Sequence, residues 1–468
     1  MLEYERLPGS PERFPDDQRA RLRLPLEPAA EPCPVVVYFH GGFWMDGYSK
    51  GNLDSGALLE AFGPGVATLD VEYARVDPLE PASSASGGGW PHTCLDALAA
   101  LNLLAEAADA HSARLDLSRV YVCGHSAGGH IALWLGVLTC LAPAEVERLA
   151  LAVGALAGES GAAAIRGGVR PPIRLAGVIG LAPVASLVAA AAAGLSDYHD
   201  ATSNFLWRLG PSGAHAAATG ALGAACPLSL LCTLNHEGGG AGEAEGEDSA
   251  EAKAGAGAEA KADAGAGGGS ALRLLLVHGS ADADVPASLS LALASACWAL
   301  PQPARVRAQF LFLPGADHYL VAGLGTLDGS SRAEGAGTGA EPLAPPRSKW
   351  GRVALALRSF VATSASAAAD AADAADAPSE RALAQLCVAS EGAARELALA
   401  EGGCELDAFP YTCARATLGR IATRESRFEE WSAAHPEAAA RMGIGLRRWL
   451  AWVGETTVDA TREWFTKH

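Results

Sequence analysis

Residues 120–138 read VYVCGHSAGGHIALWLGVL, and this stretch decides the fold. A β-branched run leads through Gly124-His125-Ser126-Ala127-Gly128 into a long apolar run. A G-x-S-x-G motif between a strand and a helix is the context of a nucleophile elbow, in which glycines permit a strained turn. The stretch therefore predicts Ser126 as a nucleophile at the N-terminus of a helix, whose dipole favours developing negative charge.

Short β-branched runs alternate with longer helical patterns on both sides of this stretch, which is typical of a parallel sheet with crossover helices. Strands are expected at 35–40, 66–71, 120–123, 175–181, 272–277 and 309–313, and helices at 93–108, 128–141, 287–300 and 349–362. The strands are almost continuously apolar, so both faces of the sheet should be covered. The fold class predicted is α/β, with a mostly parallel central sheet and helices on both faces.

A second motif, His40-Gly41-Gly42-Phe43-Trp44, follows the first predicted core strand. The negative charge of a tetrahedral intermediate must be met by fixed donors, and small residues here let backbone N–H groups turn inward. We expect the oxyanion hole to comprise the amides of Gly41, Gly42, Phe43 and Ala127.

The acid and the base should follow the serine in the order Asp or Glu, then His, at strand ends. His318 lies after the last predicted core strand and is the candidate base. Asp282 and Asp284 compete for the acid, and Asp317, adjacent to His318, is a weaker candidate. Asp282 is favoured because Asp284 abuts Val285 and Pro286 at an expected helix start, where a charge has a structural reason to exist.

The motifs together resemble a known family: HGGFW, VEYARV, GGGWP, GHSAGGHIALWLG, LAPV followed by GLSD, HGSADADVP and GADHYLV. The chain is similar, from about residue 34 to 321, to the esterase branch of the α/β-hydrolases that includes kynurenine formamidases and BD-FAE-like bacterial-type esterases. The resemblance implies Ser126, Asp282 and His318 as catalytic residues and Gly41, Gly42 and Phe43 in the oxyanion hole. It does not cover the acidic insertion at 237–270 or the region after about 363.

The resemblance implies cleavage of a carboxylic ester or an aryl formamide, without a metal or an organic cofactor. Trp44 and Trp90 are candidate substrate-binding aromatics, although Trp44 could equally be a packing residue. One alternative is a peptidase of the prolyl oligopeptidase kind, which usually carries a β-propeller, whereas some 34 residues precede the first core strand here. The other is a ligand-binding module, but such proteins generally lose the serine, the histidine or the oxyanion glycines.

Charge and composition restrict the partners. The formal charge of -18 argues against nucleic acid or an anionic membrane, which leaves a small-molecule substrate. The N-terminus resembles neither a secretory signal nor a transit peptide, so a cytoplasmic protein is expected, and ten scattered cysteines fit reduced thiols. Residues 177–195 are uncharged and long enough to cross a bilayer, but Pro183 divides them, which favours a buried strand and a turn.

Four segments are expected. An N-terminal segment covers 1–33, and an α/β-hydrolase domain covers 34–362 with disordered insertions at 237–270 and 323–347. An Ala/Asp linker follows at 363–378, and a helical extension at 379–468 packs on the hydrolase or forms a homo-oligomer.

Overall fold

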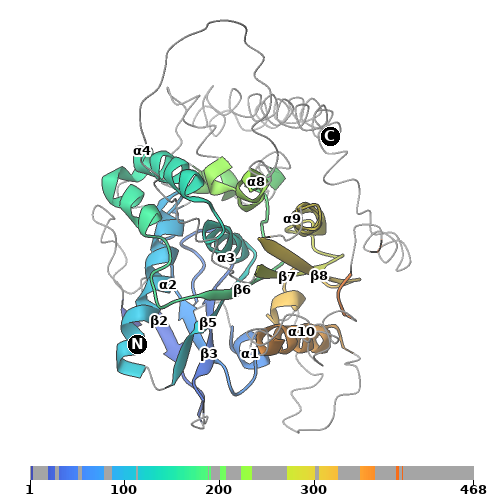
Figure 1. Cartoon of the computed structure of the whole chain (residues 1–468). Helices are drawn as coiled ribbons and strands as arrows, with labels where there is room; N and C mark the ends of the chain where they lie inside the picture. The colour runs from blue at the N-terminus through green and yellow to red at the C-terminus, as the bar shows by residue number, and fades with distance from the viewer. Residues whose placement is uncertain are drawn as a thin grey trace, which may run out of the picture.

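The structure is a computed structural model, shown in Figure 1. It describes residues 2–3, 19–26, 31–50, 55–77, 87–111, 114–187, 189–190, 201–206, 223–234, 271–300, 305–324, 348–363, 386–388 and 393. The expected insertion at 237–270, the Ala/Asp linker beyond residue 363, most of the insertion at 323–347 and nearly all of the C-terminal extension lie outside these residues.

An eight-stranded sheet organises the described part of the chain, with the strand order β1-β2-β4-β3-β5-β6-β7-β8. The strands are β1 (Leu2–Glu3), β2 (Arg19–Arg23), β3 (Cys33–Phe39), β4 (Ala67–Val71), β5 (Leu115–His125), β6 (Leu175–Leu181), β7 (Leu272–Gly279) and β8 (Val306–Leu313). Strand β2 is antiparallel to both of its neighbours, and all pairs from β4 to β8 are parallel. This is the strand order of the α/β-hydrolase fold, so the predicted fold class is confirmed.

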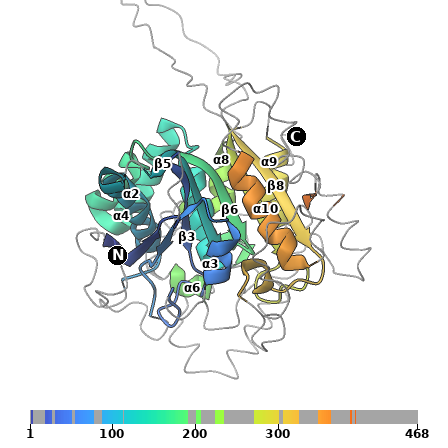
Figure 2. The ribbon, with the colours of Figure 1, turned by 90° about the horizontal axis from the view of Figure 1, so that it is seen from below.

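Helices cover both faces of the sheet (Figure 1). One face carries α2 (His92–His111), α3 (Ala127–Leu138), α4 (Pro143–Gly167), α6 (Ala201–Phe205), α8 (Pro227–Thr233) and α9 (Ala287–Trp298). The other carries α1 (Gly56–Ala61), α10 (Lys349–Thr363) and the short 3-10 helix η3 (Leu320–Ala322), and Figure 2 shows α10 crossing in front of the strands. Alternate residues of β3 enter the two cores, Val35 and Val37 on one side and Val36 and Tyr38 on the other. Because both faces of the sheet are covered, every residue of a core strand is buried on one side or the other, which accounts for the continuous apolar runs.

Every core strand and helix expected from the sequence is present, and the expected strand at 175–181 coincides with β6. The first part of the uncharged stretch 177–195 lies in strand β6, as the sequence predicts. Among the described helices, only α4 is long and apolar enough to cross a bilayer by length and composition, which is weak support for a span.

The sequence does not predict seven of the described elements, which are β1, β2, α1, α4, α6, α8 and η3. Strand β2 lies within the expected N-terminal segment and pairs with β4, with Ala20 buried in the core. Its sequence RARLR carries too much charge to look like a strand. Helix α1 is too short for a clear helical period, and α4 changes direction at Gly158, whose φ is 68°.

Candidate active site

Ser126 occupies a strained turn between β5 and α3. Its φ of 55° and ψ of -118° are unfavourable for any residue with a Cβ. The turn is held by hydrogen bonds from Ser126 N to Leu181 O at 2.9 Å and from His130 N to Ser126 O at 3.1 Å. The structure thus has the elbow geometry that the sequence predicts, with Ser126 and the amide of Ala127 at the start of α3.

The elbow glycines are required for close approach. A Cβ on Gly124 would lie 2.1 Å from Gly128 O, and a Cβ on Gly128 would lie 2.1 Å from Phe39 O. No side chain fits at either position without moving backbone, because real Cβ atoms do not approach oxygen so closely. The motif therefore sets how near α3 can lie to β5 and to the end of β3.

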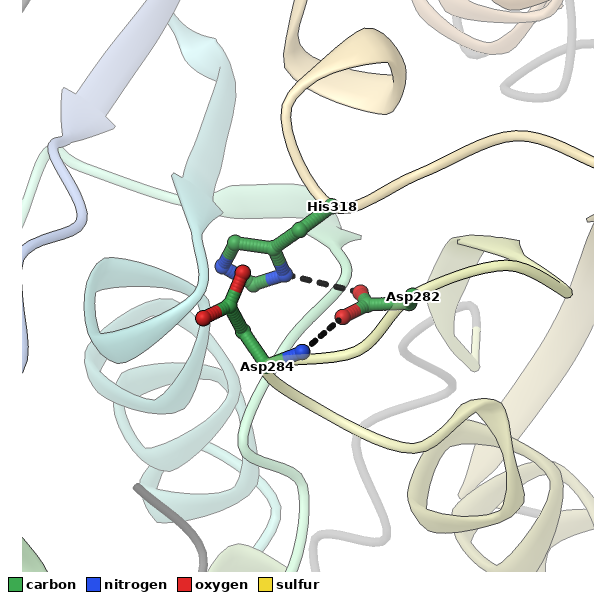
Figure 3. A group of neighbouring side chains, drawn as sticks. All are labelled: Asp282, Asp284 and His318. Atoms are coloured by element: carbon green, nitrogen blue, oxygen red, sulfur yellow. Dashed lines mark hydrogen bonds and ion pairs between the residues drawn. The ribbon is translucent and has the colours of Figure 1, made fainter. Parts of the chain in front are cut away.

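His318 and Asp282 form a hydrogen-bonded pair, drawn in Figure 3. The loop after β7 carries Asp282 and the loop after β8 carries His318, so parallel strand order brings both to one edge of the sheet. His318 Nδ1 lies 2.7 Å from Asp282 Oδ2, and the Asp282 side chain is fully buried. The ring of His318 also lies 4.5 Å, between centroids, from that of His125, the residue before Ser126.

Asp282 is positioned by further donors. Its Oδ1 accepts the backbone N–H groups of Asp284 at 3.0 Å and Val285 at 2.7 Å, and His278 Nε2 lies 3.2 Å from Oδ2. Burial alone would raise the pKa of Asp282, but hydrogen bonds from His278 and His318 outweigh it and hold this pKa well below its ordinary value. Asp282 is therefore an ionised carboxylate that can orient and stabilise an imidazolium.

The two competing carboxylates have different surroundings. Asp317 Oδ1 accepts the N–H groups of Tyr319 at 3.1 Å and Leu320 at 2.7 Å, so Asp317 caps the turn that begins η3. The Asp284 carboxylate lies beside the His318 ring (Figure 3), and ligand atoms of Asp282, Asp284 and His318 fall within 4.8 Å of one another. Such a group could hold a cation, but Asp282 already accepts N–H donors at both oxygens, which favours an acid that orients a base.

Proton transfer from Ser126 requires the His318 ring to reach its hydroxyl. Among the described residues, no hydrogen bond joins Ser126 Oγ to His318 in this structure, and such bonds are often long before substrate binds. The neighbouring contacts keep the two side chains together, since His125 Nε2 and the His318 carbonyl oxygen lie 2.9 Å apart. Burial, with the charge of His318, lowers the pKa of His125 to about 3, so His125 is neutral and donates this bond.

The expected oxyanion loop adjoins the elbow. Phe43 and Trp44 have φ near +57° and Gly42 has φ of 105°, so consecutive peptides turn in the unusual left-handed region. A Cβ added to Gly41 would lie 3.2 Å from Ser126 Cβ, which places this glycine directly against the serine. Gly41 thus lies beside the elbow serine, with Gly42 and Phe43 next to it in the loop, and the oxyanion role of these amides and of Ala127 stays a prediction.

The two tryptophans expected at the substrate lie in the core. Trp44 stacks on Phe205 at 4.5 Å and Trp90 packs edge-on against Trp134 at 5.5 Å, and their exposed fractions are 2% and 0%. Burial places both in packing roles. The half-buried aromatic side chains near the site are instead Phe43, Tyr48 and Tyr319. Tyr48 and Tyr319 were not anticipated, although Tyr319 directly follows the candidate base.

The BD-FAE family model matches residues 22–154, under a third of the chain. The match covers the HGG motif and the elbow, and confirms over this range the resemblance to BD-FAE-like esterases carried by the motifs. It supports a hydrolase of the esterase type.

Solved structures with a similar chain path were also found, and no curated protein sequence matches. The carboxylesterase Cest-2923 from Lactobacillus plantarum WCFS1 is 15% identical, with 64% of this chain and 79% of that chain covered and a TM-score of 0.40. An inhibited esterase B from Lactobacillus rhamnosis is 16% identical, with 66% and 83% covered and a TM-score of 0.40. A truncated carbohydrate esterase from gut microbiota is 16% identical, with 69% and 90% covered and a TM-score of 0.39. The fold assignment rests on the strand order of this chain and not on these scores.

Proposed function

We propose that this BD-FAE-like chain hydrolyses small carboxylic esters, or aryl formamides, through an acyl-enzyme formed on Ser126. The observation that carries the proposal is the buried Asp282–His318 pair at the sheet edge where the strained turn presents Ser126. A strained serine, an oriented imidazole and an ionised carboxylate are the three parts of a nucleophilic triad.

The reaction follows from these groups. Ser126 Oγ attacks the carbonyl carbon while His318 Nε2 accepts the hydroxyl proton, and the N–H groups of Gly41, Gly42, Phe43 and Ala127 meet the charge on the oxygen. Collapse breaks the bond to the leaving group, which takes the proton from His318. A water molecule, deprotonated by the same imidazole, then attacks the acyl-serine, and His318 returns the proton to Ser126 Oγ as the acyl–oxygen bond breaks. Asp282 keeps Nδ1 protonated throughout, so that Nε2 is free to act as the base.

The aromatic side chains beside the triad support a planar leaving group. Phe43 and Tyr48 have ring centroids 5.8 Å apart, and the Tyr319 ring lies 5.4 Å from that of His318. Burial, followed by the charges of Asp284 and Tyr48, raises the pKa of Tyr319. We define Phe43, Tyr48 and Tyr319 as the aromatic rim. A flat ring can stack on such side chains.

The same rim favours the aryl formamide as the second candidate substrate. A formyl group asks little of the acyl pocket beyond the oxyanion donors, so specificity must come from the leaving group. N-formylkynurenine is the natural test compound of this class.

Kinetics on a substrate panel test the proposal. The expected order of kcat/KM places aryl acetate, aryl butyrate and N-formylkynurenine well above a long-chain aryl ester and a dipeptide amide. Tyr48→Leu and Tyr319→Leu should raise KM for the aryl compounds more than for ethyl acetate. A dipeptide amide in the lead would favour a prolyl oligopeptidase-like peptidase, and saturable binding without turnover would indicate a ligand-binding module.

A further inference from the structure

Three buried ionisable side chains lie behind the oxyanion loop, and the reaction above does not use them. His40, Glu72 and Arg75 have side-chain exposed fractions of 1%, 3% and 5%. His40 Nε2 lies 2.6 Å from Glu72 Oε1, and Arg75 Nε lies 3.4 Å from the same oxygen. Burying charges costs desolvation energy that their attraction often only offsets, so this group is poorly explained by stability alone.

Both ring nitrogens of His40 face hydrogen-bond acceptors. Nδ1 lies 2.7 Å from Gly41 O, and Nε2 faces the Glu72 carboxylate. A carbonyl oxygen and a carboxylate can only accept, so each ring nitrogen must carry a proton when both bonds are made. Burial would raise the pKa of Glu72, but the charge and the hydrogen bond of His40 outweigh it and lower that pKa.

The bond from His40 determines how the Gly41–Gly42 peptide is turned. In a trans peptide the C=O and the N–H point in opposite directions. Because Gly41 O is held by His40 Nδ1, the N–H of Gly42 must point away from the His40 ring. The Tyr73 hydroxyl strengthens the arrangement, since it donates to His40 O at 2.8 Å and approaches Gly41 O at 3.4 Å. If the Gly41–Gly42 peptide were rotated, the carbonyl oxygen of Gly41 would face the expected oxyanion hole in place of the Gly42 N–H.

The same group also holds the far end of the loop. Glu72 Oε2 accepts the N–H of Lys50 at 3.0 Å, and the Arg75 guanidinium donates to the carbonyl oxygens of Asp46, at 3.2 Å, and Tyr48. Glu72 comes directly after β4, which pairs with β3 immediately before the loop. Glu72 and Arg75, at and just beyond the end of β4, thus bind the loop of residues 40–50 at both of its ends.

We propose that Glu72 is a positioning residue that, through its bond to the His40 ring, holds the Gly42 N–H as an oxyanion donor. The inference rests on the proposed serine-hydrolase function. It explains why charged residues are buried beside a glycine loop, and it assigns a role to the VEYARV motif that sequence similarity alone does not provide.

The test is Glu72→Gln, which keeps the shape of the side chain and removes the charge that pairs with His40. We expect kcat for an aryl acetate to fall at least about tenfold, since an oxyanion donor is worth about 100- to 1,000-fold and would be misdirected part of the time. KM should change less than about twofold, because the ground-state carbonyl makes little use of the donor. Fluorophosphonate labelling of Ser126 should slow in parallel, because the phosphoryl oxygen occupies the same hole.

Asp96→Asn is the matched control. Asp96 is also a buried carboxylate near this strand end, but its Oδ2 accepts the N–H of Ala74, at 2.7 Å, in place of a bond to His40. Its loss should lower the melting temperature without the selective fall in kcat. The kcat of the double variant Glu72→Gln, His40→Gln should be no lower than that of the more impaired single variant, because both substitutions break the same Glu72–His40 bond.

The outcomes separate the two proposals. If wild type neither turns over esters nor reacts with the fluorophosphonate, the proposed function fails. The positioning role is wrong if wild type is active and Glu72→Gln has the kcat of wild type. It is also wrong if Glu72→Gln lowers kcat and raises KM to the same degree as Asp96→Asn does. Should Glu72→Gln not fold, His40→Gln decides, because it removes the ring through which Glu72 acts. A kcat within twofold of wild type would overturn the proposal.

Discussion

Asp282→Asn is the perturbation whose consequence can be worked out most fully from the structure. The carboxylate faces backbone donors at one oxygen, from Asp284 and Val285, and imidazoles at the other, from His318 and His278. An asparagine has one acceptor and one donor end, so it can match only one of these sides. In either orientation, the side-chain NH2 of the asparagine therefore faces another N–H donor.

The preferred orientation keeps the carbonyl oxygen toward the two backbone N–H groups and turns the amide NH2 toward His318. His318 Nδ1 must then accept, its proton moves to Nε2, and the ring cannot take the proton of Ser126. We expect kcat to fall by about 10³- to 10⁴-fold, equivalent to about 4–5.5 kcal/mol in the barrier. The other orientation would leave two buried donors unsatisfied, at about 1–3 kcal/mol each.

Aryl acetate hydrolysis and urea unfolding measure both effects in one preparation. Asp284→Asn is the matched control, because this half-buried carboxylate lies beside the ring without the bonds of Asp282 in the described structure. It should retain activity within about tenfold. The reasoning is refuted if Asp282→Asn stays within tenfold of wild type, or if Asp284→Asn is the more damaging change.

Three further predictions concern stability and organisation. Burial lowers the pKa of His130 to about 4 in the folded protein, whereas the unfolded chain binds this proton below about pH 6.5. The contribution of neutral His130 to stability is therefore complete above about pH 6.5 and is lost as the pH falls toward 4. His130→Gln should therefore reduce the drop in unfolding free energy between pH 7.5 and 5.5 by about 1 kcal/mol in urea titrations, and an unchanged drop would contradict this. Gly124→Ala should cost at least about 2 kcal/mol and abolish labelling, because its Cβ would meet Gly128 O at 2.1 Å, whereas Gly65→Ala, with open space, should be near neutral by thermal melting. Replacing 237–270 by a short Gly/Ser loop should leave kcat and melting temperature nearly unchanged, since loop entropy grows slowly with length, and a large loss of either would show that the acidic segment docks on the enzyme.

The parts that could be predicted from sequence depend on local patterns. The elbow needs its glycines because backbone approaches backbone there, and strand periodicity places Gly41, Asp282 and His318 at strand ends that a parallel sheet brings to one edge. The preference for Asp282 over Asp284 rested on a helix-start argument, and the structure adds the 2.7 Å bond to His318. The catalytic roles of these residues stay predictions.

The parts that could not be predicted depend on distant contacts. Strand β2 is held by pairing with β4 despite its arginines, and no local pattern announces that pairing. The sequence leaves Trp44 open as a substrate-binding or a packing residue, and Phe205, far along the chain, stacks on it. The His40–Glu72 pair joins residues 32 apart, so its bonds appear only once β3 and β4 are side by side.

The most direct test of the central claim is the site of covalent labelling by a fluorophosphonate, located by peptide mass spectrometry. The probe reacts with an activated serine whatever the natural substrate is. We expect one modified residue, Ser126, in wild type, and no labelling of Ser126→Ala at unchanged melting temperature. Labelling of wild type at a different serine, or undiminished labelling of Ser126→Ala, would contradict the account.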